Sequence, residues 1–151
     1  MAPPHLHHVT SDQVARLLSA CLREGCLAAT LNRIAPGKRL IDVLVPANLF
    51  PHFSEVDRAV AVEQLLLHAC AARDAKRAEA AQILLGLSGG WKDESVTQRR
   101  QAVGRLLGGS GDGFRRRHEA DLLHDVAFEA IRLAADMPYS EPQQLHLHLV
   151  V

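Results

Sequence analysis

The chain has 151 residues, enough for one domain with a buried core, and 48% of them are apolar, mostly Ala and Leu. Acidic and basic residues balance at 17 each, so the chain as a whole creates no field that would attract nucleic acid. No apolar run is long enough to cross a bilayer, and the first ten residues lack the basic flank and apolar stretch of a signal peptide. We therefore expect a single cytoplasmic domain over residues 1–151, without membrane association.

The first half of the chain predicts three helices. A capping-box pattern at Thr10 opens the first helix, and Gly25 fits its left-handed end. A second helix is predicted over Cys26–Ile34, ended by Pro36 and the glycine that follows it. Arg39–Val45 is apolar enough for a buried strand, but no hairpin partner follows it, so we interpret it as a short helix.

The second half of the chain predicts five more helices, of which the fourth is short. In chain order they span Glu55–Arg73, Ala75–Leu87, Ser95–Leu107, Asp112–His118 and Glu119–Asp136. Glu55–Arg73 is apolar nearly all round, which is typical of a helix at the centre of a core.

The two ends, residues 1–10 and 138–151, are expected to be extended. Leu145–Val150 alternates apolar residues with His, which is the periodicity of a strand. Pro4–Val9 could pair with it, although an isolated two-stranded ribbon is only marginally stable. The predicted fold class is all-α, a bundle of five to seven helices, with a small terminal ribbon as an open alternative.

Residues 95–118 have the sequence features of a degenerate helix–turn–helix. That motif needs a small residue where its helices cross, a Gly at the turn, a capping residue and an apolar anchor. Here these positions are occupied by Gly104, Gly108, Ser110 and Phe114. The second helix also contains Gly111 and Gly113, and each Gly inside a helix costs about 1 kcal/mol relative to Ala.

The same segment concentrates positive charge. Seven bases and three acids lie between Lys92 and His118, so this stretch carries +4 and the remainder −4. The candidate residues for contact with nucleic acid or with a protein partner are Arg99, Arg100, Arg105, Arg115, Arg116 and Arg117. The alternative is that these arginines form solvated helix faces, some paired with acids such as Glu119.

The run Leu84–Ala127 resembles a helical segment found in many uncharacterised actinobacterial proteins. Its pattern is a Leu-Leu-Gly-Leu element, Arg-Arg before an Ala, Leu-Gly, Ser, Phe-Arg-Arg, Glu and Leu-Leu. The matching residues are Leu84, Leu85, Gly86, Leu87, Arg99, Arg100, Ala102, Leu107, Gly108, Ser110, Phe114, Arg115, Arg116, Glu119, Leu122 and Leu123. Those proteins resemble modules or adaptors of bacterial signalling and defence systems, so the resemblance implies a regulatory or adaptor role.

Neither a cofactor site nor a metal site is predicted. Gly108–Gly113 is glycine-rich, but it lacks the Lys-Ser/Thr of a phosphate loop and joins helix to helix. His118, Asp121, His124 and Asp125 have helical spacing without the His-Glu-x-x-His pattern of zinc helices.

Neither the cysteines nor the serines indicate a catalytic site. The three cysteines are odd in number and lie in apolar patterns, so we expect them to be buried thiols. No Ser or Cys lies in a recognisable nucleophile motif, and we expect no enzymatic activity.

The leading interpretation is a non-enzymatic regulatory or adaptor module that binds another protein or a second copy of itself. The alternative is a DNA-binding transcriptional regulator that uses the basic segment 95–118.

Overall fold

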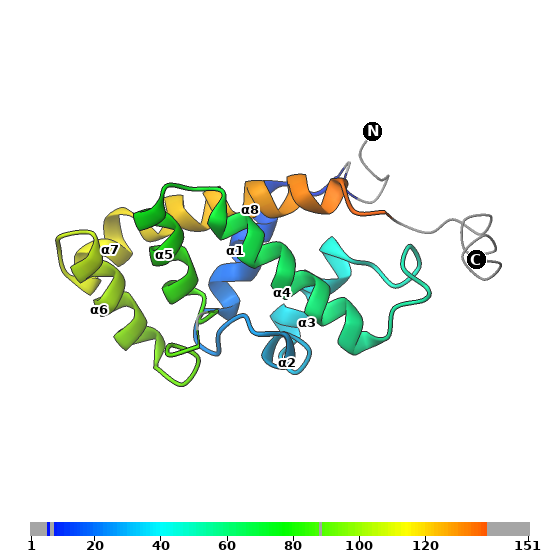
Figure 1. Ribbon diagram of the computed structural model, residues 1–151, viewed down its shortest axis with the longest axis horizontal. Coiled ribbons are helices and arrows are strands. Elements are labelled where there is room, and N and C mark those ends of the chain that lie inside the picture. The colour runs from blue at the N-terminus through cyan, green and yellow to red at the C-terminus, as the bar shows by residue number, and fades with distance from the viewer. Residues whose placement is uncertain (1–5, 7, 88, 139–151) are drawn as a thin grey trace.

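A computed structural model of the chain describes residues 6, 8–87 and 89–138 (Figure 1). The described part is all-helical, as predicted. Its helices are α1 (Ser11–Cys21), α2 (Ala28–Leu31), α3 (Ala35–Leu44), α4 (Glu55–Ala71), α5 (Ala75–Leu84), α6 (Val96–Leu106), α7 (Gly111–Arg117) and α8 (Glu119–Ala135). Within these residues no helix has both the length and the apolar character needed to span a membrane. The proposed ribbon segment Leu145–Val150 lies outside the described residues.

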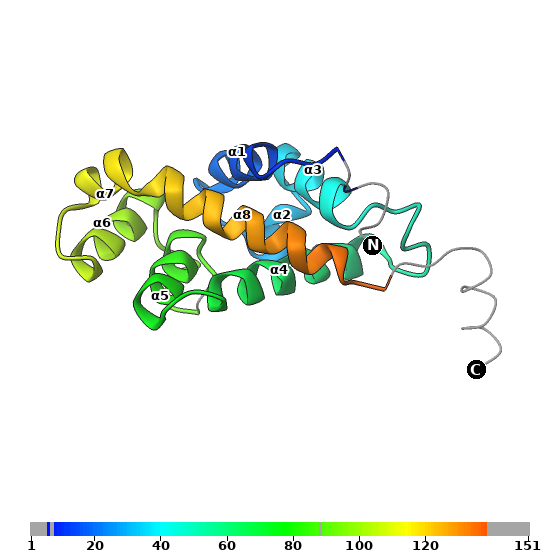
Figure 2. The ribbon, with the colours of Figure 1, turned by 90° about the horizontal axis from the view of Figure 1, so that it is seen from above.

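The described residues form eight helices, one more than the upper limit of the predicted range. The backbone at His118, where φ is −128° and ψ is −23°, separates α7 from α8, close to the predicted boundary between Asp112–His118 and Glu119–Asp136. The bundle is elongated, with α6 and α7 at one end (Figures 1 and 2).

Helix starts follow the capping chemistry of the sequence. Reciprocal capping boxes open α1 at Thr10, α4 at Ser54 and α6 at Ser95, where each side chain accepts a hydrogen bond from the third residue of its helix. Asp74 and Ser110 cap α5 and α7 in the same way, without the reciprocal bond.

The expectation that Pro36 ends a helix is wrong. The second helix is only Ala28–Leu31, and Pro36 lies in the first turn of α3. Proline is favoured in the first helical turn because its missing N–H would have no intrahelical acceptor there. The segment Arg39–Val45 is helical almost throughout, as interpreted, because α3 continues to Leu44.

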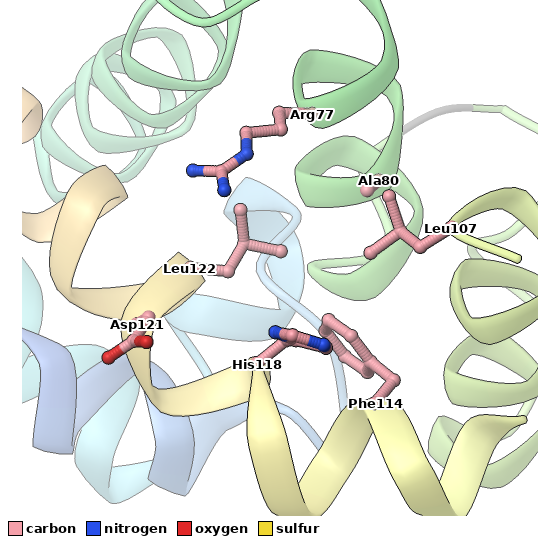
Figure 3. Close-up of a pocket in the computed structure, with 7 residues that line it drawn as sticks. All are labelled: Arg77, Ala80, Leu107, Phe114, His118, Asp121 and Leu122. Carbon is pink, nitrogen blue, oxygen red and sulfur yellow. The ribbon is translucent and has the colours of Figure 1, made fainter. Parts of the chain in front are cut away.

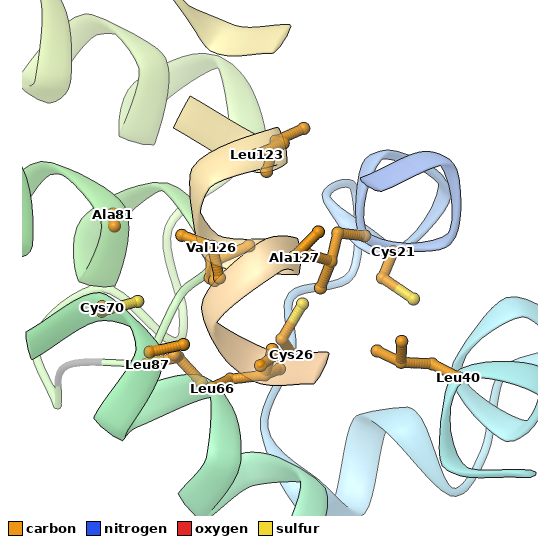
Figure 4. Close-up of a cluster of buried hydrophobic side chains, with 14 of the residues drawn as sticks. Cys21, Cys26, Leu40, Leu66, Cys70, Ala81, Leu87, Leu123, Val126 and Ala127 are labelled. Atoms are coloured by element: carbon orange, nitrogen blue, oxygen red, sulfur yellow. The ribbon is translucent and has the colours of Figure 1, made fainter. Parts of the chain in front are cut away.

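The core is a single apolar cluster around α8. That helix lies between α1 on one side and α4 on the other, and all three contribute fully buried side chains (Figure 2). The buried apolar residues include Leu40, Leu66 and Val126, and the three cysteines are buried free thiols among them (Figure 4). Burial of this kind contributes about 25 cal/mol per Å² of apolar surface removed from water.

Candidate functional site

Helices α6 and α7 form a compact pair joined by a short turn. Gly108 has a φ of +86°, the left-handed conformation that glycine adopts without strain, and Ser110 then caps α7 through the N–H of Gly113 at 3.0 Å. Phe114 is 3% exposed and anchors α7 in the core. The structure thus places the predicted turn, cap and anchor residues within one two-helix unit.

Gly104 lies where the two helices approach most closely. A Cβ at this position would lie 2.6 Å from the amide nitrogen of Gly111, and nearer still to the carbonyl group of Ser110. No side chain fits there, because real Cβ atoms essentially never lie within 3.0 Å of the backbone of another residue. The close approach of α6 and α7 therefore depends on this glycine.

Arg99, a predicted contact residue, is instead buried at 2% exposure. Its Nη1 donates to the carbonyl of Leu84 at the end of α5, and its Nη2 donates to the carbonyl of Leu22 at the end of α1. Its Nε donates to the carbonyl of Glu94 at 3.2 Å. Helix ends leave such carbonyls without intrahelical donors, so the guanidinium caps two helices at once. Arg99 is a structural residue and is not accessible to a partner.

Arg100 is also used within the fold. Its Nε lies 2.7 Å from Oε1 of Glu119, and its Nη2 lies 3.1 Å from Oε2 of the same carboxylate. The side chains are only 18% and 10% exposed, respectively. This two-point ion pair joins α6 to the first residue of α8, which removes a second arginine from the predicted contact set.

The other four arginines are exposed. Arg116 pairs with Asp112 one turn earlier, at 3.0 Å. Arg105, Arg115 and Arg117 form no ion pair within the described part of the chain. Successive helical residues point about 100° apart, so Arg115, Arg116 and Arg117 spread around α7 and do not form one ridge.

A cleft beside α7, here called the α7 cleft, opens between α5 and α8 (Figure 3). Its volume is about 230 Å³, and its lining residues are Arg77, Ala80, Leu107, Phe114, His118, Asp121 and Leu122. The apolar side chains of Leu107, Phe114 and Leu122 surround the hollow, with Arg77 at its opposite edge (Figure 3). Leu107 is 38% exposed although it belongs to this apolar wall.

Arg77 and Ala80 were not predicted as site residues, because they come from α5, which is remote in the chain from α7. Arg77 reaches Asp125 of α8, with 3.6 Å between Nη1 and Oδ2, and this carboxylate also pairs with Arg73 at 3.4 Å. One sequence feature could have identified Leu107 as a site residue: it is an apolar residue directly before the Gly108-Gly109 turn.

The helical His and Asp residues weighed for metal binding do not converge. His118 and Asp121 line the α7 cleft, whereas His124 lies 3.3 Å from Asp12 of α1. Among residues 6, 8–87 and 89–138, no group of three or more His, Cys, Asp or Glu side chains is arranged to hold a metal ion.

Comparisons with protein-family models, with curated protein sequences and with solved structures find no match to this chain.

Proposed function

We propose that this chain is a non-enzymatic regulatory or adaptor module that binds a protein partner at its α6–α7 end. The observation that carries the proposal is the α7 cleft, an apolar hollow whose wall residue Leu107 is open to solvent and whose lining also includes the charged residues Arg77 and Asp121. An apolar centre with a polar rim is the usual anatomy of a protein-binding surface. The resemblance of Leu84–Ala127 to bacterial signalling and defence modules agrees with such a role.

The size of the cleft supports a protein ligand. Small-molecule sites usually measure roughly 300–1,000 Å³, and the α7 cleft, at about 230 Å³, is smaller. A hollow of this size suits one or two side chains of a partner, which is how an anchor residue engages its pocket.

The cysteines fit an intracellular setting for this role. All three are free and buried, and free thiols persist in reducing compartments. We therefore propose that the module acts in the cytoplasm.

The test is affinity capture of the tagged chain from cells of its source, with the bound proteins identified by mass spectrometry. Replacement of Leu107 by Ser should remove the specific partner, because it deletes the exposed apolar wall of the cleft. Phe128→Ser is the matched control, since Phe128 is 57% exposed on α8 and does not line the cleft. Capture that is unchanged by Leu107→Ser would reject the α7 cleft as the binding site.

A second candidate function, DNA binding, is favoured by one specific observation. Arg105, Arg115 and Arg117 are exposed and make no ion pair in the described residues, so they could contact phosphates. Replacement of Arg115, Arg116 and Arg117 by Ala should then weaken binding to a duplex and flatten its dependence on salt. Absence of duplex binding by the unmodified chain at low salt would exclude this candidate.

A further inference from the structure

Two of the three buried thiols, those of Cys21 and Cys26, lie together where α1 ends. The Cys26 thiol donates a hydrogen bond to the sulfur of Cys21, and both side chains are 0% exposed. Together with Cys70 they belong to the apolar core cluster, and all three thiols are free (Figure 4). Two thiols in contact can be joined by a disulfide only where the backbone already brings their residues close together.

The backbone of the turn after α1 brings these two residues together. Gly25 has a φ of +92°, and its N–H donates to the carbonyl of Cys21 at 2.8 Å. A helix end with a left-handed glycine folds the next residue back onto the last turn of the helix, which here places Cys26 against Cys21. The N–H of Cys26 donates to the carbonyl of Leu85 at 2.8 Å and holds Cys26 there. The contact between the two thiols is therefore a property of the turn.

The three thiols differ in how easily they ionise. The hydrogen bond from Cys26 lowers the pKa of the Cys21 thiol, and the same bond, with burial, raises the pKa of the Cys26 thiol well above its usual value. Burial raises the pKa of Cys70 to about 12. Because the thiolate is the form that peroxides oxidise, Cys21 is the thiol that reacts first, and Cys26 is in place to attack the product.

The turn that holds this pair also anchors α6. Leu22 follows Cys21 directly, and its carbonyl accepts a hydrogen bond from Nη2 of Arg99. Nη1 of the same guanidinium donates to the carbonyl of Leu84 at the end of α5. The charge of Arg99 also acts on the Cys26 thiol. A change in the backbone between the two cysteines therefore reaches Arg99 directly.

We propose that Cys21 and Cys26 form a redox switch, in which a disulfide closes between them under oxidation and shifts the turn that anchors Arg99. Forming the covalent bond draws the two sulfur atoms closer than their hydrogen-bonded contact, so the turn has to tighten and the Leu22 carbonyl moves away from the guanidinium. The proposal does not depend on which partner occupies the α7 cleft.

The oxidant is a peroxide, and hydrogen peroxide gives a balanced reaction. The Cys21 thiolate attacks one peroxide oxygen, the O–O bond breaks, and the released hydroxide takes up a proton and leaves as water, which gives a sulfenic acid at Cys21. The Cys26 sulfur then attacks the Cys21 sulfur, the S–O bond breaks, and the Cys26 proton leaves with the hydroxyl group as a second water. The two thiols are oxidised and the peroxide is reduced. Both sulfurs are buried, so peroxide reaches them by local opening of the turn, whose exposed residues are Arg23 and Glu24.

The first test counts free thiols in the reduced, purified full chain after exposure to hydrogen peroxide. We expect the count to fall from three to one, and mass spectrometry of unreduced peptides to find Cys21 joined to Cys26. Dithiothreitol should restore all three thiols. Cys26→Ser should stop at the sulfenic acid of Cys21, which dimedone traps, whereas the matched control Cys70→Ala should still form the disulfide. Circular dichroism verifies that each variant keeps its helices.

Two results of this test would overturn the proposal. One is a chain that keeps all three thiols when free glutathione in the same solution is fully oxidised, because a switch has to respond as readily as the small thiols around it. The other is a disulfide that includes Cys70 or joins two chains, because the turn after α1 would then not direct the reaction.

The second test measures whether the disulfide acts on Arg99. Urea unfolding compares the reduced and the oxidised chain, each with and without Arg99→Met. The substitution should lower the urea midpoint of the reduced protein, and should lower that of the oxidised protein much less, because the Leu22 carbonyl has already moved away. Arg105→Met, at an exposed position on the same helix, should leave both midpoints unchanged. Equal shifts for Arg99→Met in the two redox states would show that the two sites are independent and would overturn the action on α6.

Discussion

Arg100 of α6 and Glu119 of α8 form a two-point ion pair with distances of 2.7 and 3.1 Å, and both side chains are largely buried. The ion pair holds the N-terminal end of α8 against α6. It thereby sets the position of α7, the helix that connects them in the chain. The geometry of the α7 cleft therefore depends on a contact that is not itself part of the cleft.

Breaking this pair from one side should be costly. Arg100→Met leaves the Glu119 carboxylate buried without a cation, and we expect a loss of about 3 kcal/mol in the free energy of unfolding. Replacing both residues, Arg100→Met with Glu119→Leu, should restore most of that loss because no uncompensated charge remains. Urea unfolding of the single and double variants measures both effects. A double variant as unstable as Arg100→Met alone would contradict this explanation.

Arg99 and Arg105 offer a matched comparison on the same helix. Arg99→Met removes the donors to the carbonyls of Leu22 and Leu84, and each orphaned buried acceptor costs about 1–3 kcal/mol. Arg105 is exposed without an ion pair in the described residues, so Arg105→Met should change stability by less than about 0.5 kcal/mol. Chemical denaturation of the two variants distinguishes a structural arginine from a solvated one, and equal losses would show that the assignment of Arg99 is wrong.

Replacing Gly104 or Gly109 of the α6–α7 unit by Ala should change the stability of the fold by very different amounts. Gly104→Ala places a Cβ against the backbone of Ser110 and Gly111, so we expect α6 and α7 to separate and stability to fall by about 1–3 kcal/mol or more. Gly109 has open space around its Cα, and Gly109→Ala should be neutral or stabilise by up to about 1 kcal/mol. Thermal unfolding followed by circular dichroism compares the two. A tolerated Gly104→Ala would mean that the helices do not cross as closely as described.

The α6–α7 unit could be predicted from sequence because its determinants are local. Ser95, Gly108 and Ser110 act within a few residues of themselves through caps and one left-handed turn. The role of Arg99 as a helix cap could not be predicted, because one of its acceptors is the carbonyl of Leu22, 77 residues earlier in the chain. Charge counting treats every arginine alike, whereas tertiary packing determines which arginine caps helix ends, which pairs with an acid and which stays exposed.

The α7 cleft was beyond sequence reasoning for the same reason. Its wall combines α5 residues with α7 and α8 residues, and only the packing of α5 beside α8 brings them together. The error at Pro36 has a different origin. Proline occurs both after the end of one helix and in the first turn of the next. Only the observed start of α3 at Ala35 shows which of these two positions Pro36 occupies.

Cys70 should make the fold less stable at alkaline pH. Burial raises the pKa of the Cys70 thiol to about 12, above the value of about 9 for an exposed thiol. The thiol stays protonated in the folded state while the unfolded chain ionises, so its contribution to stability is complete below pH 9 and is lost as pH rises toward 12. The slope from this one group approaches about 1.4 kcal/mol per pH unit within that window.

The measurement is urea unfolding of the unmodified chain and of Cys70→Ala at several pH values between about 8 and 11. Every other ionisable residue is present in both proteins, so the difference between their curves reports the removal of the Cys70 thiol. The variant should be less stable at pH 8, because it leaves a small cavity, and the gap should narrow as pH rises. Two curves that remain parallel over this range would show that Cys70 ionises as readily in the folded protein as in the unfolded chain, and its burial within the core would have to be reconsidered.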